Sequence, residues 1–288
     1  MAFFNYTCPK SGVLRQCSMN DTLTEDLVST KRTLLKKDRD SFLCIDGYEG
    51  SGKSVVGFQI CSFMDPTFNL SRVCFTAEEF KSAVMKAKHH ESIMFDEAFS
   101  GLNSRASLSK LNRMLVNLMM QMRQKNLFVL IVLPSVFLLD RYVALFRSNG
   151  LIHCHVGKND RHMFFVFNRQ NKKKLLLEGA KTMDYAKTIK TTKSIYRGGF
   201  RNCYANIDED EYRKKKMKAF ETMGEGEIPE EKIYYNQRNK LINIISQEYD
   251  VSLRKMEKLF LKYEFPLKAS GIRGALENFK KEGDKNEI

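Results

Sequence analysis

Residues 47–54 have types and a spacing suited to holding phosphate groups, and we call them the phosphate loop. They match the pattern G-x-x-x-x-G-K-[ST] completely and are Gly47, Tyr48, Glu49, Gly50, Ser51, Gly52, Lys53 and Ser54. The glycines let backbone N–H groups curl around phosphate oxygens, and a helix that begins there adds partial positive charge. Lys53 would reach the β- and γ-phosphates and Ser54 would ligate Mg²⁺. The loop therefore predicts binding of ATP with Mg²⁺.

Two adjacent carboxylates, Asp96 and Glu97, follow the mostly apolar run 92–95. Such a run predicts a buried strand, and a carboxylate at its carboxyl end is placed to hold Mg²⁺, directly or through water. We assign that role to Asp96 and the role of general base for an attacking water to Glu97. The loop and the carboxylates together predict hydrolysis of the nucleotide.

The elements that would position these side chains alternate along the chain. Apolar runs predict strands at residues 42–46, 72–75, 92–96, 127–133, 151–156 and 163–167. Helices are expected from the phosphate loop to about residue 64, from the cap Thr76 to about residue 88, and over about residues 107–122. Strands alternating with helices predict an α/β fold, a mainly parallel sheet with helices on both faces.

The order of these motifs resembles a known group of proteins. One strand, residues 72–75, separates the phosphate loop from the Asp96 strand, and a glutamate follows Asp96. This order resembles the additional-strand catalytic-glutamate division of P-loop ATPases. Residues 41–156 are similar to its ring-forming motors, the FtsK/HerA-like, zonular occludens toxin-like and phage DNA-packaging ATPases. The resemblance implies a homo-oligomeric ring that uses ATP and Mg²⁺ to move DNA.

Two further residues take roles from this resemblance. Arg123 closes a helix before strand 127–133, and it resembles the arginine finger that reaches a neighbouring subunit's nucleotide in the packaging ATPases. It could instead only cap the helix C-terminus. Other arginines are open for the finger role: Arg105, Arg113, Arg141 and Arg147. Ser135 follows the strand where FtsK/HerA-like proteins carry a glutamine that senses the γ-phosphate, and its hydroxyl could take that glutamine's place.

Positive charge is concentrated in one stretch. The 288 residues include 48 Lys and Arg against 34 Asp and Glu, a net charge of +14. Residues 169–201 hold ten basic and two acidic side chains, or 10 − 2 = +8 of that total. A local surplus of this size favours an anionic polymer, here nucleic acid and in particular double-stranded DNA. The other interpretation is a solvated, mobile loop.

Changes of character along the chain predict three parts. These are an N-terminal extension (1–40), an ATPase core with the basic stretch (41–203) and a C-terminal helical module (204–288). Apolar spacing in the last part predicts three short helices, which are compatible with a DNA reader and equally with a small bundle that contacts protein.

Cysteine and histidine usage is typical of a reduced core. The seven cysteines include no C-x-x-C pair, and Cys44, Cys61 and Cys74 fall in apolar runs. His153 and His155 would share one face of a strand, as part of the core in our interpretation or as metal ligands in the alternative one. No run reaches the roughly 20 apolar residues of a membrane span, and the start shows no signal peptide. We expect a cytoplasmic protein without a membrane partner.

Taken together, these features predict an ATP-driven DNA translocase, in its narrowest form a viral genome-packaging motor. Two alternatives stay open. One is a replication helicase or helicase-loader ATPase. The other is a nucleotide-gated regulator whose C-terminal module reads a DNA site.

Overall fold

The chain divides into two compact units, Met1–Gly224 and Glu225–Ile288. A computed structural model describes residues 1–96, 113, 116–118, 120–182, 185–224, 238–239, 241–242, 244–245, 252–262 and 272. The first unit contains the phosphate loop, Asp96 and the basic stretch, so the candidate site is built within it.

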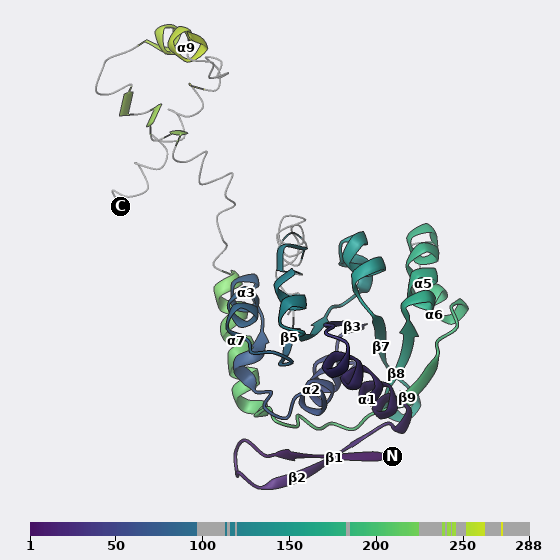
Figure 1. Cartoon of the computed structure of the whole chain (residues 1–288). Helices are drawn as coiled ribbons and strands as arrows, with labels where there is room; N and C mark the ends of the chain where they lie inside the picture. Colours follow the sequence, from purple (N-terminus) through teal and green to yellow (C-terminus); the bar gives the residue numbers. More distant parts are fainter. Residues whose placement is uncertain are drawn as a thin grey trace. The chain divides into compact units, whose positions relative to one another are not determined.

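A seven-stranded sheet organises the described part of the first unit (Figure 1). Its strands are β3 (Ser41–Gly47), β4 (Val73–Cys74), β5 (Ser92–Asp96), β6 (Phe128–Val132), β7 (Gly150–Val156), β8 (His162–Asn168) and β9 (Tyr196–Gly199). They lie in the order β4-β5-β6-β3-β7-β8-β9, with parallel pairing from β4 to β7 and antiparallel pairing of β8 and β9. The predicted α/β fold with a mainly parallel sheet is confirmed.

Helices cover both faces of this sheet because its central strands are buried on both sides. The helices are α1 (Asp21–Lys36), α2 (Lys53–Met64), α3 (Ala77–Lys86), α5 (Arg169–Thr182), α6 (Tyr185–Thr191) and α7 (Glu209–Gly224). On β6, Val129 and Ile131 face a core shared with α3 and α5. Leu130 faces the opposite core, shared with α1, α2 and α7. β6 therefore lies fully buried between the phosphate-loop strand β3 and the Asp96 strand β5.

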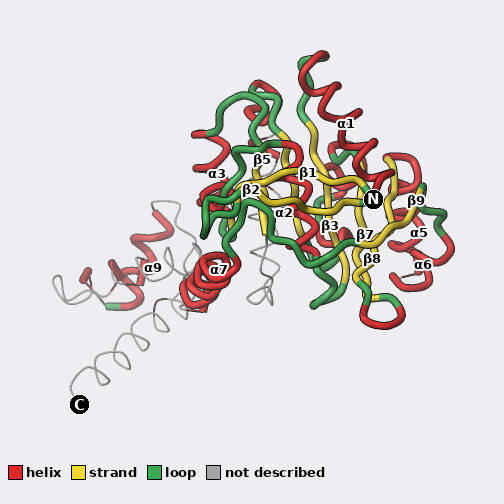
Figure 2. Tube along the Cα trace, turned by 90° about the horizontal axis from the view of Figure 1, so that it is seen from below, coloured by secondary structure: helices red, strands yellow, loops and turns green. Residues whose placement is uncertain are grey.

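Most of the N-terminal extension is folded. β1 (Ala2–Thr7) and β2 (Leu14–Met19) form an antiparallel hairpin separate from the main sheet, seen from below in Figure 2. α1 begins after Asn20, whose side-chain oxygen accepts a hydrogen bond from the N–H of Leu23. Leu23 and Leu27 then pack into one core of the sheet, so the extension belongs to the first unit.

The boundary between the two units differs from the predicted one. The sequence predicts that the C-terminal module begins at residue 204, whereas the first unit extends to Gly224. The reason is that α7 is polar on average but carries Tyr212 and Ala219 on a face that packs into the core beside α2. In the second unit, α9 (Leu253–Lys262) contributes Met256 to a small buried core, and much of the three predicted helices lies outside the described residues.

Two other expectations concern helices. The predicted helix at 107–122 lies largely outside the described residues, although positions 113, 116–118 and 120–124 are helical. Among the helices that the structure describes, none combines the length and apolar character needed to cross a bilayer.

Candidate nucleotide-binding site

The phosphate loop joins the end of β3 to the start of α2. Gly47 and Gly52 have φ values of +139° and +83°, in the region that side chains rarely adopt. A Cβ atom at Gly47 would lie 2.1 Å from the carbonyl oxygen of Cys154, and one at Gly52 would lie 2.9 Å from the ring of Phe200. The curled loop therefore requires glycine at both positions, for conformation and for space.

Lys53 is the first residue of α2, and its side chain folds back over the loop. Its Nζ donates hydrogen bonds to the carbonyl oxygens of Gly47 and Tyr48, each at 2.8 Å. Burial lowers the pKa of Lys53, an effect that the nearby carboxylate of Asp96 opposes. An ammonium group in this position can exchange its carbonyl partners for phosphate oxygens, which form stronger charge-assisted bonds.

The two predicted Mg²⁺ ligands, Asp96 and Ser54, both lie near the hydroxyl group of Tyr212. Asp96 ends β5 at the edge where the loop begins, because parallel strands present their carboxyl ends together. Its carboxylate is 2% exposed and accepts a hydrogen bond from the Tyr212 hydroxyl at 2.6 Å. The side chain of Ser54 lies near the same hydroxyl, which also accepts a hydrogen bond from Nζ of Lys216 at 3.4 Å.

This donor set fits Mg²⁺ bound together with a nucleotide. Mg²⁺ is usually held by one or two carboxylates, with phosphate oxygens and water completing its shell. One buried carboxylate and one hydroxyl beside a phosphate-binding loop meet that description. A cage made only of protein is a different arrangement, and no group of three or more His, Cys, Asp or Glu in the described part of the chain could form one.

The remaining predicted site residues are placed unevenly. Glu97 lies outside the described residues, as does Arg105. Arg123 is exposed at the end of its helix. Ser135 caps the short turn Val136–Leu138 with its side-chain oxygen. It lies beside the loop, because the preceding residue's carbonyl oxygen accepts a hydrogen bond from the N–H of Gly47 at 3.4 Å. The roles of these residues stay predictions.

The other candidate arginines differ in their availability. Arg147 forms an ion pair with Asp40 of the same chain, which makes it a poorer candidate for reaching a neighbouring subunit. Arg113 and Arg141 are exposed, like Arg123. Of these three, Arg123 alone closes a helix directly before β6, and the resemblance to an arginine finger rests on that position.

A buried pair lies at the start of the loop. Oδ1 of Asp46 is 2.9 Å from Nδ1 of His153, and Oδ2 of Asp46 accepts a hydrogen bond from the N–H of Val136 at 2.9 Å. His155 stacks on Phe165 with ring centroids 4.5 Å apart, and burial lowers the pKa of its imidazole. The two imidazoles also lie nearly parallel, with centroids 6.3 Å apart, and the Asp46–His153 contact joins β3 to β7 where the loop begins.

Three side chains that the sequence does not single out contact the site. Tyr212 bonds to Asp96 across 116 residues of sequence, and Nδ1 of His162 lies 3.2 Å from the carbonyl oxygen of Ser51 across 111 residues. Phe200 packs against Gly52. No local sequence pattern identifies these residues, because their positions depend on how distant elements pack.

Most of the described part of the basic stretch 169–201 is helix or strand, in α5, α6 and β9, so the interpretation as a loop is wrong for these elements. Its exposed basic side chains are Arg169, Lys173, Lys174, Lys181, Lys187, Lys190, Lys193, Arg197 and Arg201. Lys172 is the exception, since it is fully buried and donates hydrogen bonds to the backbone and hydroxyl oxygens of Ser148. Lys172 therefore cannot contribute to a nucleic-acid surface.

Burial of Lys172 predicts a rise of stability with pH. Burial lowers its pKa from the usual 10.5 to about 8. Between these values the unfolded chain binds more protons than the folded one, so the free energy of unfolding increases with pH, by up to about 3 kcal/mol. We expect Lys172→Met to lack this rise and the exposed control Lys174→Met to retain it. Urea unfolding at about pH 7.5 and about pH 10 measures it, and an identical rise in Lys172→Met would contradict the assignment.

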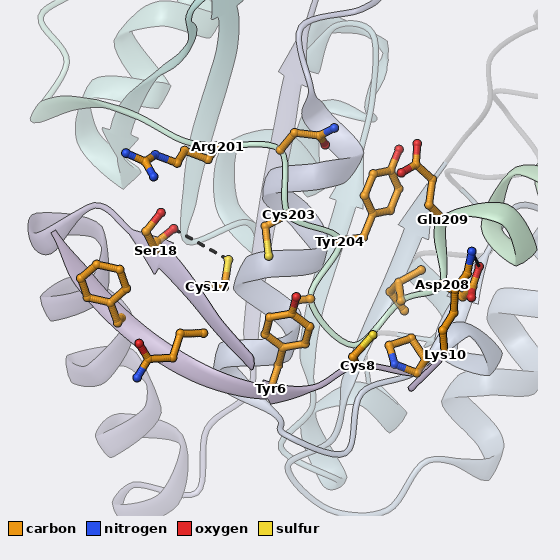
Figure 3. Close-up of a pocket in the computed structure, with 16 residues that line it drawn as sticks. Tyr6, Cys8, Lys10, Cys17, Ser18, Arg201, Cys203, Tyr204, Asp208 and Glu209 are labelled. Atoms are coloured by element: carbon orange, nitrogen blue, oxygen red, sulfur yellow. Dashed lines mark hydrogen bonds and ion pairs between the residues drawn. The ribbon is translucent and has the colours of Figure 1, made fainter. Parts of the chain in front are cut away.

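A cavity of about 520 Å³ lies beside the β1–β2 hairpin, between it and residues 201–209 (Figure 3). Residues of the phosphate loop do not line it. The thiols of Cys17 and Cys203 both line it, and the neighbouring Cys17 side chain lowers the pKa of Cys203 to about 6. The cavity is therefore chemically distinct from the candidate nucleotide site.

Comparison with known proteins adds a likeness among solved structures. No protein-family model and no curated protein matches the sequence. Among solved structures, the chain is similar to the N-terminal domain of zonular occludens toxin from Neisseria meningitidis. The sequence identity is 12% and the TM-score 0.35, over 61% of this chain and 98% of that one. The class of protein follows from this chain's own sheet order and loop, which define a P-loop NTPase-like α/β fold.

Proposed function

We propose that the chain binds ATP with Mg²⁺ and hydrolyses it. The observation that carries this proposal is the placement of Lys53 over a glycine-curved loop, with Asp96 and Ser54 around one hydroxyl at the same sheet edge. Loop N–H groups and the N-terminus of α2 would hold the phosphates, and Lys53 would neutralise their oxygens. Ser54 and Asp96 would hold Mg²⁺, which supplies further charge neutralisation. Glu97 would accept the proton of the attacking water.

We infer that hydrolysis takes place in a ring of identical subunits and moves double-stranded DNA. Arg123 supports a ring because it is exposed and free to reach a neighbouring subunit's nucleotide, where an arginine finger can raise the rate about 10³–10⁵-fold. The exposed basic side chains of α5, α6 and β9 support DNA, since each can neutralise a backbone phosphate. Packaging of a viral genome, in the host cytoplasm, is the narrowest form of this function.

The test is the steady-state ATPase rate of the full chain without DNA and with short and long duplexes, at low and moderate salt. Lys53→Ala serves as the blank. We expect stimulation that grows with DNA length and weakens with salt, because phosphate contacts release counterions.

Other outcomes separate the alternatives. Turnover that is indifferent to DNA, together with a defined footprint, would replace the motor with a nucleotide-gated regulator. Strand unwinding, or capture of a replicative helicase, would favour the helicase or loader. Absence of Mg²⁺-dependent ATP binding by the wild type would overturn the proposal.

A further inference from the structure

Tyr212 of α7 reaches the predicted Mg²⁺ ligands from outside every motif of the sequence. Its hydroxyl donates to Oδ2 of Asp96 at 2.6 Å, and the side chain is 5% exposed. The Tyr212 oxygen accepts a hydrogen bond from Nζ of Lys216 at 3.4 Å, and the side chain of Ser54 lies near it. Hydrogen bonds thus run from Lys216 through Tyr212 to Asp96, beside Ser54.

The ring of Tyr212 is held firmly in this position. It packs edge-on against Phe58 of α2, with centroids 4.9 Å apart at 78°, and lies 5.7 Å from the ring of Phe75. One turn further along α7, Lys215 donates a hydrogen bond to the carbonyl oxygen of Val73 and lies 3.5 Å from the carboxylate of Glu79. α7 is therefore anchored to the elements around β4, and the side chain of Tyr212 has little freedom to leave the site.

The hydrogen bond from Tyr212 leaves one metal-binding oxygen of Asp96 available. A carboxylate has two oxygens, and Tyr212 engages Oδ2 of Asp96, which leaves Oδ1 for a cation. Metal ligands are commonly oriented by such outer partners, and loss of one costs about 10- to 100-fold in metal affinity.

We propose that Tyr212 is a positioning residue that orients Asp96 toward the Mg²⁺ of bound ATP. The inference rests on the proposed function, since it concerns the metal of that site. It makes α7 part of the nucleotide site, although α7 lies beyond the basic stretch in the sequence and ends at the boundary of the second unit.

The competing explanation is that the ring of Tyr212 only fills space. In that case its hydroxyl bonds to Asp96 merely because this carboxylate is nearby. Tyr212→Phe separates the two, because it keeps the ring packing and removes only the donor. The matched control is Tyr204→Phe: Tyr204 belongs to the same aromatic cluster, 5.6 Å from Phe58, but its hydroxyl interacts with Glu209 and Arg213.

The experiment measures binding of a fluorescent ATP analogue to the full chain while Mg²⁺ is titrated, and again in EDTA. We expect Tyr212→Phe to raise the Mg²⁺ concentration for half-maximal binding by about 10-fold or more. Affinity in EDTA should stay within about twofold of wild type, because the phosphate loop is intact. Tyr204→Phe should behave as wild type in both titrations, and melting temperatures show whether each variant is folded.

Each outcome bears on one proposal. Mg²⁺-dependent binding by the wild type with the same Mg²⁺ requirement in Tyr212→Phe overturns the role of Tyr212 and leaves the proposed function standing. A wild type that binds no nucleotide overturns the proposed function itself. p-Aminophenylalanine at position 212 keeps the ring and a weaker donor, so we expect an intermediate requirement. If Tyr212→Phe does not fold, the variant with p-aminophenylalanine decides. A wild-type Mg²⁺ concentration for half-maximal binding in that variant would then overturn the proposal.

Discussion

Lys53→Ala is expected to abolish ATP turnover, with a loss of at least about 10²–10³-fold. The ammonium group is held over the loop by the carbonyl oxygens of Gly47 and Tyr48, where the β- and γ-phosphates would lie. No other basic side chain belongs to the loop. Negative charge develops on the γ-phosphate during hydrolysis. Without Lys53, the nearest group that would neutralise this charge is missing. Phosphate release from ATP measures the loss.

The control for this variant is Lys86→Ala, which removes an exposed lysine at the end of α3. We expect it to hydrolyse ATP at the wild-type rate. Circular dichroism and the melting temperature show whether Lys53→Ala is folded. Normal hydrolysis by folded Lys53→Ala would show that the phosphate loop is not the catalytic nucleotide site.

Glu97→Gln is expected to keep ATP binding and to lose turnover by about 10²-fold or more. The glutamine has the shape of the glutamate but cannot accept a proton from the attacking water. Glu97 directly follows Asp96, whose buried carboxylate ends β5 beside the loop. Binding and single-turnover hydrolysis, measured separately, distinguish loss of the base from loss of the site.

Glu25→Gln, an identical chemical change at an exposed position of α1, is the matched control and should leave the rate unchanged. A wild-type single-turnover rate in Glu97→Gln would remove Glu97 from the role of base. A variant that lost ATP binding as well would indicate that Glu97 helps to hold the nucleotide or its metal ion.

The parts of the site that could be predicted are those that short stretches of sequence determine. The strand expected at 42–46 is β3, and the helix expected after the loop is α2, which ends at Met64. The cap Thr76 starts α3 as predicted, through a bond from the N–H of Glu79 to its side-chain oxygen. Strand and helix periodicities and caps are local properties, so a few adjacent residues suffice to specify them.

The lysines of the basic stretch show what local sequence cannot predict. In the sequence, Lys172 and Lys173 are equivalent members of one basic stretch. In the fold, the first is buried against Ser148 and the second lies at the surface, over the ring of Phe146. The helix period places them on different faces, but which face meets the core is decided by the neighbouring β7 and β8.

The sequence by itself determined the phosphate loop, the alternation of strands and helices, and the placement of Asp96 at a strand end. Only the tertiary structure decided which distant groups complete the site: Tyr212 on Asp96, His162 on the backbone of Ser51, and Phe200 on Gly52. The reason is physical. A loop or helix is set by backbone conformations and nearby side chains, whereas a contact across more than a hundred residues exists only after the sheet order and both cores have formed.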